Sequence, residues 1–322
     1  MLLLAGLMGA LAVGATAFMG IDFGNDDENR DVAPPGQDDL SPDIDTPDLF
    51  DVIARQEAEG VIAWGDEGDD SLTGGDGGDR LNGYAGDDRI AGGDGGDSLH
   101  GNDGQDTLWG EAGNDSLHGG AGDDSLLGGD GNDSIFGHGG ADEIDGGTGD
   151  DSLQGSAGDD TVNGGAGDDA VHGGLDDDVL AGGDGADTLF GGLGNDVVDG
   201  SDDAETDYLN GGEGDDMILA GAGDIVTAGE GADTIALTDW LNKDHQAEVM
   251  DFSASDDSLM VIFDDGADPD PEVGIEADED DADRQYITLN GVRIAAIIGA
   301  DGLTLDHITL VPQSAADQMA VA

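Results

Sequence analysis

Cysteine is absent from this sequence and basic side chains are nearly so, because seven Lys and Arg residues face 77 Asp and Glu residues over 322 positions. Without cysteine, neither a disulfide framework nor a thiolate metal site can form. The formal net charge of -70 argues against nucleic acid and anionic membrane surfaces as partners, since both require positive charge on the protein. Multivalent cations are the partners that this charge favours.

Catalytic motifs are also missing. The sequence has neither a His-Glu-x-x-His zinc motif nor a Gly-x-Ser-x-Gly nucleophile elbow. Pairs of Asp residues are numerous, but the repeat described next accounts for them as turn formers and cation ligands rather than as an acid and a base. We therefore expect no catalytic activity.

Glycine is abundant, with 61 residues, and it follows a period of nine from Gly65 to Ala236. Fifteen uninterrupted units end at Asp199, and units of eleven, nine, eight and nine residues complete nineteen. When the two units of irregular length are aligned with the others, the sixth place of every unit is Asp, and the eighth is Leu, Ile or Val. Uniform disorder does not produce such phasing, whereas a fixed short period is typical of a solenoid.

The unit itself predicts an all-β coil. Glycine at the first, second and fourth places allows φ > 0 and predicts a tight turn over the first six residues. The last three residues predict a short strand with its middle side chain turned inward. Two units then form one flattened coil, and equivalent aspartates of successive coils stack about 4.8 Å apart, Asp115 over Asp133 and Asp124 over Asp142.

This stack of aspartates requires a counter-charge. Two carboxylates about 5 Å apart repel by roughly 3 kcal/mol at an effective dielectric constant near 20. No Lys or Arg occurs between Arg89 and Lys243, so the chain supplies no counter-charge in that part of the repeat. Bound divalent ions resolve the repulsion, and carboxylate and carbonyl oxygens suit Ca²⁺ better than Mg²⁺, which demands octahedral geometry and keeps its waters. We expect the repeat block to be disordered without calcium and to fold when calcium binds.

The units Gly119 to Leu127 and Gly128 to Phe136 resemble the Gly-Gly-x-Gly-x-Asp-x-apolar-x nonapeptide of the RTX, or haemolysin-type, calcium-binding family. The resemblance covers residues 65–236 and implies a parallel β-roll that binds several Ca²⁺ ions between consecutive turns on the same side. It implies that glycine-region carbonyls and the sixth-place carboxylates hold the ions. The side-chain ligands so assigned are Asp70, Asp79, Asp88, Asp97, Asp106, Asp115, Asp124, Asp133, Asp142, Asp151, Asp160, Asp169, Asp178, Asp187, Asp196, Asp207, Asp216, Asp224 and Asp233.

Three of these sites depart from the family pattern. Asp176 replaces the fourth-place glycine of its unit, and the units that begin at Gly200 and Ala220 have the wrong length. We expect the sites of Asp178, Asp207 and Asp224 to be weak or empty. Substitutions at the second place should matter less.

Residues 1–20 are uncharged and predict either a signal peptide or an uncleaved membrane anchor. An anchor would be the only membrane contact. Residues 21–64 are acidic and contain Pro34, Pro35, Pro42 and Pro47, which predicts a linker. The resemblance implies export by type I secretion machinery, a route that an apolar N-terminus does not fit, and the sequence leaves both routes open.

Residues 237–322 leave the nine-residue pattern and predict a small β-rich cap, which a solenoid requires at an open end. Strands are expected over 258–263 and 303–311, and a hairpin over 286–298 turns at Asn290-Gly291. The last residues are compatible with an uncleaved type I secretion signal.

Several ninth-place side chains share one surface of a predicted sheet. His100 and His118 are two units apart and offer two ligands to a transition metal, although ordinary surface positions explain them as well. Trp109 with Leu127, and Phe136 with Phe190, offer small apolar patches, for which solvent-facing positions are again the simpler interpretation.

These observations favour an exported calcium-binding protein, extracellular or at the cell surface, with a structural or adhesive role toward a surface polymer or another cell. The alternative is a non-catalytic relative or carrier part of a type I secreted protease or lipase. Ice binding by a calcium-ordered solenoid requires a flat outward array of Thr, and the mixed third-place residues argue against it.

Overall fold

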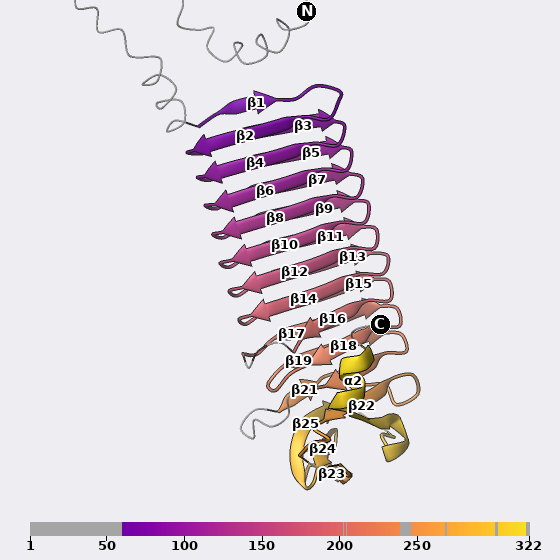
Figure 1. The fold of residues 1–322 in the computed structure, drawn as a ribbon. Helices are drawn as coiled ribbons and strands as arrows, with labels where there is room; N and C mark the ends of the chain where they lie inside the picture. The colour runs from indigo at the N-terminus through magenta and orange to yellow at the C-terminus, as the bar shows by residue number, and fades with distance from the viewer. Residues whose placement is uncertain are drawn as a thin grey trace, which may run out of the picture. The chain divides into compact units, whose positions relative to one another are not determined.

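The computed structural model describes residues 60–201, 203, 205–238, 246–267, 269–299 and 302–319. They form a β-solenoid in which each pair of nine-residue units closes one coil (Figure 1). Successive strands of the repeat lie alternately in two facing parallel sheets, and in the regular units residues 18 positions apart pair with each other, as Ser116 pairs with Ser134. The steps that span the irregular units are 20 and 17 residues long. The predicted all-β parallel β-roll is therefore confirmed.

The strands of the first sheet, in their spatial order, are β1 (Ile62–Trp64), β3 (Arg80–Ala85), β5 (Ser98–Asp103), β7 (Ser116–Ala121), β9 (Ser134–Gly139), β11 (Ser152–Ala157), β13 (Ala170–Leu175), β15 (Thr188–Leu193), β17 (Tyr208–Glu213), β19 (Ile225–Glu230), β21 (Ala247–Val249), β25 (Val292–Ile298), β24 (Arg284–Leu289) and β23 (Val273–Ala277). The strands of the second sheet are β2 (Ser71–Asp76), β4 (Arg89–Asp94), β6 (Thr107–Ala112), β8 (Ser125–Asp130), β10 (Glu143–Thr148), β12 (Thr161–Ala166), β14 (Val179–Asp184), β16 (Val197–Gly200), β18 (Met217–Ala220), β20 (Thr234–Leu237), β22 (Ser258–Phe263) and β26 (Ile308–Pro312).

The strands are longer than the sequence predicted. A typical strand has six residues, from the seventh place of one unit to the third place of the next, and only places four to six turn. The prediction of a six-residue turn and a three-residue strand was wrong because glycines at the first and second places pair across the sheet or lie between paired residues. Gly120, for example, pairs with His138.

Glycine has two different roles in the unit. At the second and fourth places it adopts positive φ, as at Gly120 (130°) and Gly122 (126°). At the first place φ is not in the left-handed region, so the prediction for that place was wrong. The first-place glycine points into the coil, where a Cβ would lie closer than 3.0 Å to the carboxylate of its own unit, as at Gly128 and Asp133. Glycine at the first place avoids this collision with the carboxylate.

The core is the file of eighth-place side chains between the two sheets. All of them from Leu81 to Ile235 are at most 2 % exposed, and only Leu72, in the first coil, is partly buried. The file runs on through Leu259 and Val261 into the C-terminal part. The core is one side chain thick, so each coil depends on its neighbours for burial.

The C-terminal part continues the coil instead of merely covering it. Strands β21 and β22 pair in parallel with the last strands of the repeat, and β25 and β26 pair in parallel with them in turn. The expected hairpin is present, because β24 and β25 are antiparallel around Asn290 and Gly291, both with positive φ. The expected strand over 303–311 is shorter, since η2 (Leu305–His307) precedes β26, and α2 (Gln313–Met319) follows it.

At the other end the coil starts earlier than predicted. Strand β1 pairs in parallel with β3, so residues 62–64 belong to the sheet and not to the predicted linker. The predicted signal or anchor segment, residues 1–20, lies outside the described residues, as does the linker to residue 59. Within the described part of the chain, no helix has the length and apolar character needed to cross a membrane.

Candidate metal centre

The sixth-place aspartates form two ladders inside the turns, one at each edge of the solenoid. Eighteen of the nineteen predicted ligands, all except Asp70, are at most 4 % exposed. From Asp88 to Asp233, the Oδ1 atom of each ladder aspartate accepts a hydrogen bond from the backbone N–H of the aspartate two units earlier. The N···O distances are 2.7–3.1 Å. The predicted stacking of Asp115 on Asp133 and of Asp124 on Asp142 is observed.

The second carboxylate oxygen has no partner at most positions of the ladders. Buried oxygens without a partner destabilise a fold strongly, and a native protein rarely keeps many of them. Here sixteen Oδ2 atoms are buried without any hydrogen bond, those of Asp79, Asp88, Asp97, Asp106, Asp115, Asp124, Asp133, Asp142, Asp151, Asp160, Asp169, Asp178, Asp187, Asp196, Asp216 and Asp233.

Backbone carbonyl oxygens face the same space as these Oδ2 atoms. A Cβ placed on Gly128 would lie closer than 3.0 Å to both Asp133 Oδ2 and the carbonyl oxygen of Gly146. The same two kinds of oxygen converge at Gly110, where they are Oδ2 of Asp115 and the carbonyl oxygen of Gly128. Carboxylate and carbonyl oxygens without an N–H between them form a ligand set that fits Ca²⁺. No group of three or more His, Cys, Asp or Glu side chains in the described residues is placed to hold a metal ion, so backbone oxygens must complete any site on the ladders.

Burial makes the ionised form of these carboxyls costly. The pKa of Asp124 and Asp169 is raised to about 7 and that of Asp207 to about 8, mainly by burial and in smaller part by the neighbouring carboxylates of the ladder. The backbone N–H bond to Oδ1 acts in the opposite direction but is the smaller effect. The ladder therefore requires a positive counter-charge if its carboxyls are to stay ionised at neutral pH.

Three predicted ligands differ from the rest. Oδ2 of Asp70 accepts the N–H of Asp66 at 2.6 Å, and Oδ2 of Asp224 accepts the N–H of Gly221 at 2.6 Å. Asp207 belongs to the eleven-residue unit and does not show the buried, unpartnered Oδ2 of the regular units. Asp178 keeps the regular geometry although Asp176 precedes it, because Asp176 adopts the φ of 74° that its fourth place requires.

Sequence reasoning missed one member of the ladder, Asp257. It is 6 % exposed, and its Oδ1 accepts the N–H of Asp233 at 3.2 Å, so it takes the sixth place of a further turn. Its Oδ2 accepts the N–H of Ser253 at 2.7 Å. The segment Asp256-Asp257-Ser258-Leu259 repeats the Asp-Asp-Ser-Leu of regular units and is the signal that could have revealed it.

The fifth-place residues form a second, exposed ladder on the outside of the turns. Here the direction is reversed at the steps where the fifth residue is Asp or Asn and the bond forms, since its side-chain oxygen accepts the N–H of the residue two units later, as Asp123 Oδ1 accepts that of Ala141 at 3.0 Å. Asn114 and Asn195 serve equally well, accepting the N–H groups of Asn132 and Asp215. Because a neutral amide replaces the carboxylate, this ladder supports the turn without requiring negative charge.

The ninth-place side chains on the first sheet stack as the sequence predicted. The rings of His100 and His118 are 4.7 Å apart, and Phe136 stacks on His118 at 4.9 Å. A third imidazole that sequence reasoning missed, His138, reaches this cluster. Burial lowers the pKa of His118 to about 4, and it lowers the pKa of His100 below its ordinary value, so both rings are mainly neutral at pH 7.

The apolar pairs differ in their geometry. Trp109 and Leu127 lie side by side on β6 and β8. Phe136 and Phe190 are three strands apart in the sheet, on β9 and β15, and Phe190 packs on His172 instead. The predicted Phe136–Phe190 patch was wrong because ninth-place residues are neighbours only when their units are two apart.

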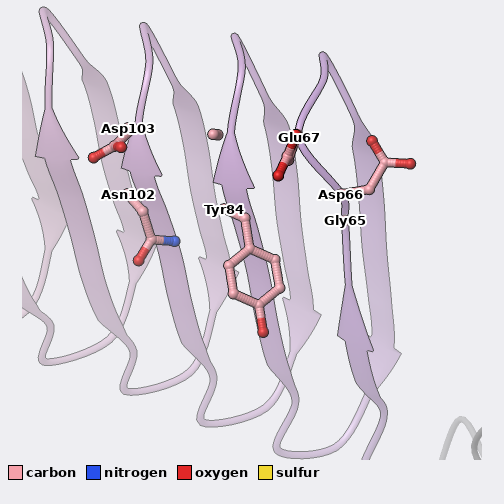
Figure 2. Close-up of a pocket in the computed structure, with 7 residues that line it drawn as sticks. Gly65, Asp66, Glu67, Tyr84, Asn102 and Asp103 are labelled. Atoms are coloured by element: carbon pink, nitrogen blue, oxygen red, sulfur yellow. The ribbon is translucent and has the colours of Figure 1, made fainter.

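A hollow of about 480 Å³ lies on the outer surface near the first coils. Figure 2 shows Tyr84 and Asn102 projecting from neighbouring strands, with Asp66, Glu67 and Asp103 at the turns beside them. The residues that line it include no His, Ser, Thr, Cys or Lys, and hence no nucleophile paired with a nitrogen base.

The profile of the RTX calcium-binding nonapeptide repeat family matches seven segments of this chain, 64–99, 91–126, 100–135, 118–153, 145–180, 172–204 and 203–235. These overlapping segments cover more than half of the residues, and the chain belongs to this family. The resemblance seen in the sequence is confirmed. Calcium binding follows from membership, and the buried aspartate ladders are the feature of this structure that corresponds to it.

Among solved structures, the chain is similar to the solution structure of the AlgE6R3 subunit from the Azotobacter vinelandii mannuronan C5-epimerase. The identity is 23 %, the match covers 44 % of this chain and 78 % of that one, and the TM-score is 0.28. No curated protein matches the chain.

Proposed function

We propose that this protein is an exported scaffold that folds when it binds calcium outside the cell, has no catalytic activity of its own, and serves a structural or adhesive role at the cell surface or in the matrix. One observation carries the proposal: sixteen buried Oδ2 atoms have no hydrogen-bond partner, and fourteen of them, from Asp97 to Asp233, lie between Arg89 and Lys243, where the sequence has no Lys or Arg. To stay ionised, these carboxylates require cations supplied from outside the chain.

The calcium concentration decides whether the free energy gained from binding offsets the cost of burying the ladder carboxylates. Each ionised carboxylate removed from water costs several kcal/mol unless it is paired. A site with a dissociation constant near 0.1 mM, in the range of extracellular calcium modules, gains about 1.4 kcal/mol at 1 mM calcium. The binding free energies of many such sites along the solenoid add up, and the stacking of coils on one another couples the sites. In calcium-poor cytoplasm the same chain lacks this gain and stays unfolded and exportable.

A calcium titration of the full chain, followed by far-UV circular dichroism and size-exclusion chromatography, tests the coupling of folding to calcium. We expect a cooperative gain of β-structure and a smaller hydrodynamic radius between about 0.1 and 1 mM calcium. Magnesium at the same concentrations should have little effect. A spectrum that calcium leaves unchanged would contradict the proposal.

The location and the lack of catalysis require a second experiment. Cells that produce the protein are fractionated, and the medium, the surface fraction and the cytoplasm are probed for it. Protease and lipase activities of the medium are compared with those of a deletion strain. The proposal requires protein outside the cytoplasm and equal activities in both strains. Activity that disappears with the deletion would favour a part in a secreted hydrolase.

A further inference from the structure

Two histidine rings meet on the outer face of the first sheet. The Nδ1 atom of His118, on β7, lies 3.0 Å from the Nε2 atom of His138, on β9. Their ring centroids are 5.3 Å apart, and His100 stacks against the other side of His118.

The strand register explains why these two rings meet. His118 is directly opposite Phe136, whereas His138 is directly opposite Gly120. Because Gly120 has no side chain, the ring of His138 has free space beside β7 and reaches His118 on the diagonal. His138 holds this position with φ of 79°, at a second place that is glycine in most units. The juxtaposition therefore depends on a residue that the local backbone disfavours.

We propose that His118 and His138 chelate a transition-metal ion of the class that prefers imidazole, such as Cu²⁺, Zn²⁺ or Ni²⁺. Two imidazole nitrogens bound to one ion at about 2.0–2.1 Å are roughly 3 Å apart when they occupy adjacent coordination positions, and the observed separation is 3.0 Å. Calcium prefers oxygen ligands, so the ions of the ladders do not compete for this pair.

The surroundings favour a cation. No Lys or Arg lies between Arg89 and Lys243, so no fixed positive charge in the part of the sequence around His118 and His138 opposes the ion. Among the described residues no third His, Cys, Asp or Glu side chain is placed to complete the site, so the pair supplies two ligands and water supplies the others. Such a site is open, and its free positions can accept a ligand from outside the chain.

The test uses the full chain in saturating calcium, so that the ladders are filled before the second metal is added. Cu²⁺ is titrated by isothermal calorimetry, and the electron paramagnetic resonance spectrum of bound Cu²⁺ is recorded for nitrogen couplings. We expect one Cu²⁺ per chain with nitrogen ligands, beyond any weak binding to surface carboxylates.

Three variants separate a site from adventitious binding. His118→Asn removes one ligand, and His138→Gly removes the other while restoring the common second-place residue, so the fold is kept. His172→Asn changes a ninth-place histidine on the same face that packs on Phe190 and, among the described residues, has no second imidazole beside it. The first two should lose the nitrogen-coupled site, whereas His172→Asn should keep it, with the same calcium midpoint in all three. Equal Cu²⁺ binding by His138→Gly and the parent, or no nitrogen-coupled Cu²⁺ in the parent, would overturn the proposal and leave a hydrogen bond between the two rings.

Discussion

The backbone N–H of Asp124 donates a 2.8 Å hydrogen bond to Oδ1 of Asp142, two units further along the chain, while Oδ2 of Asp142 has no partner. One carboxylate therefore serves two purposes. Its first oxygen holds successive turns in register, and its second faces the backbone carbonyls inside the turn. The requirement for a cation and the turn-to-turn contact are properties of the same side chain.

Asp142→Asn should weaken calcium binding without breaking the turn. The amide keeps an oxygen for the N–H of Asp124, but it removes a charged ligand from its side of the coil. We expect one or two fewer bound calcium ions and a loss of about 1–3 kcal/mol in the free energy of unfolding at 1 mM calcium. Equilibrium dialysis and urea denaturation measure the two quantities.

Asp123→Asn is the matched control, since it makes the same change on the exposed ladder, at the residue just before Asp124. Its calcium count and stability should equal those of the parent. If both variants lose calcium equally, the exposed ladder also binds ions and the assignment to the buried ladder is wrong.

Gly146→Ala should be poorly tolerated. A Cβ at Gly146 would lie closer than 3.0 Å to Asp151 Oδ2 and to the carbonyl oxygen of Gly164, the two oxygens that face a cation. We expect the calcium midpoint of folding to rise and stability to fall by about 1–3 kcal/mol through overpacking. Gly139→Ala tests the same change at a third place, where a Cβ would lie 4.0 Å from the nearest backbone oxygens. A calcium midpoint unchanged in both variants would show that the first place has room for a side chain larger than that of glycine.

The nine-residue period was sufficient to predict the coil, the core file from Leu81 to Ile235 and the stacking of the aspartates, because these depend only on spacing. It did not predict the strand length, since the abundance of glycine suggested turns where glycine pairs across the sheet, as at Gly120. Nor did it reveal the His118–His138 contact, which is a diagonal between strands and depends on the empty place at Gly120. Asp257 was missed because an irregular segment separates it from the last regular unit.

Asp176→Gly should stabilise the protein. Asp176 occupies a fourth place with φ of 74°, a conformation that glycine adopts without steric cost. We expect a gain of about 1 kcal/mol in the free energy of unfolding in calcium. Asp177→Asn removes a charge from the same turn without changing the backbone requirement, and it should give a smaller gain. Equal gains from both variants would assign the effect to charge and not to the backbone, and chemical denaturation distinguishes these outcomes.

Acid should partly replace calcium. Burial raises the pKa of Asp124 and Asp216 to about 7 and that of Asp207 to about 8, from an ordinary value of 3.8. A carboxyl whose pKa is higher in the folded state than in the unfolded state stabilises the fold when it is protonated. That contribution is complete below about pH 4 and is lost as the pH rises through 7 and 8.

The calcium-free chain should therefore gain β-structure when the pH is lowered from 8 to 5, and it should lose it again on return to pH 8. With calcium present, lowering the pH should have the opposite effect, because protons compete with calcium for the same Oδ2 atoms. The calcium midpoint of folding should therefore rise as the pH falls. Circular dichroism at several pH values, with and without a calcium chelator, measures both trends. A calcium-free chain whose spectrum does not change between pH 8 and pH 5 would show that the buried carboxylates are not what prevents folding.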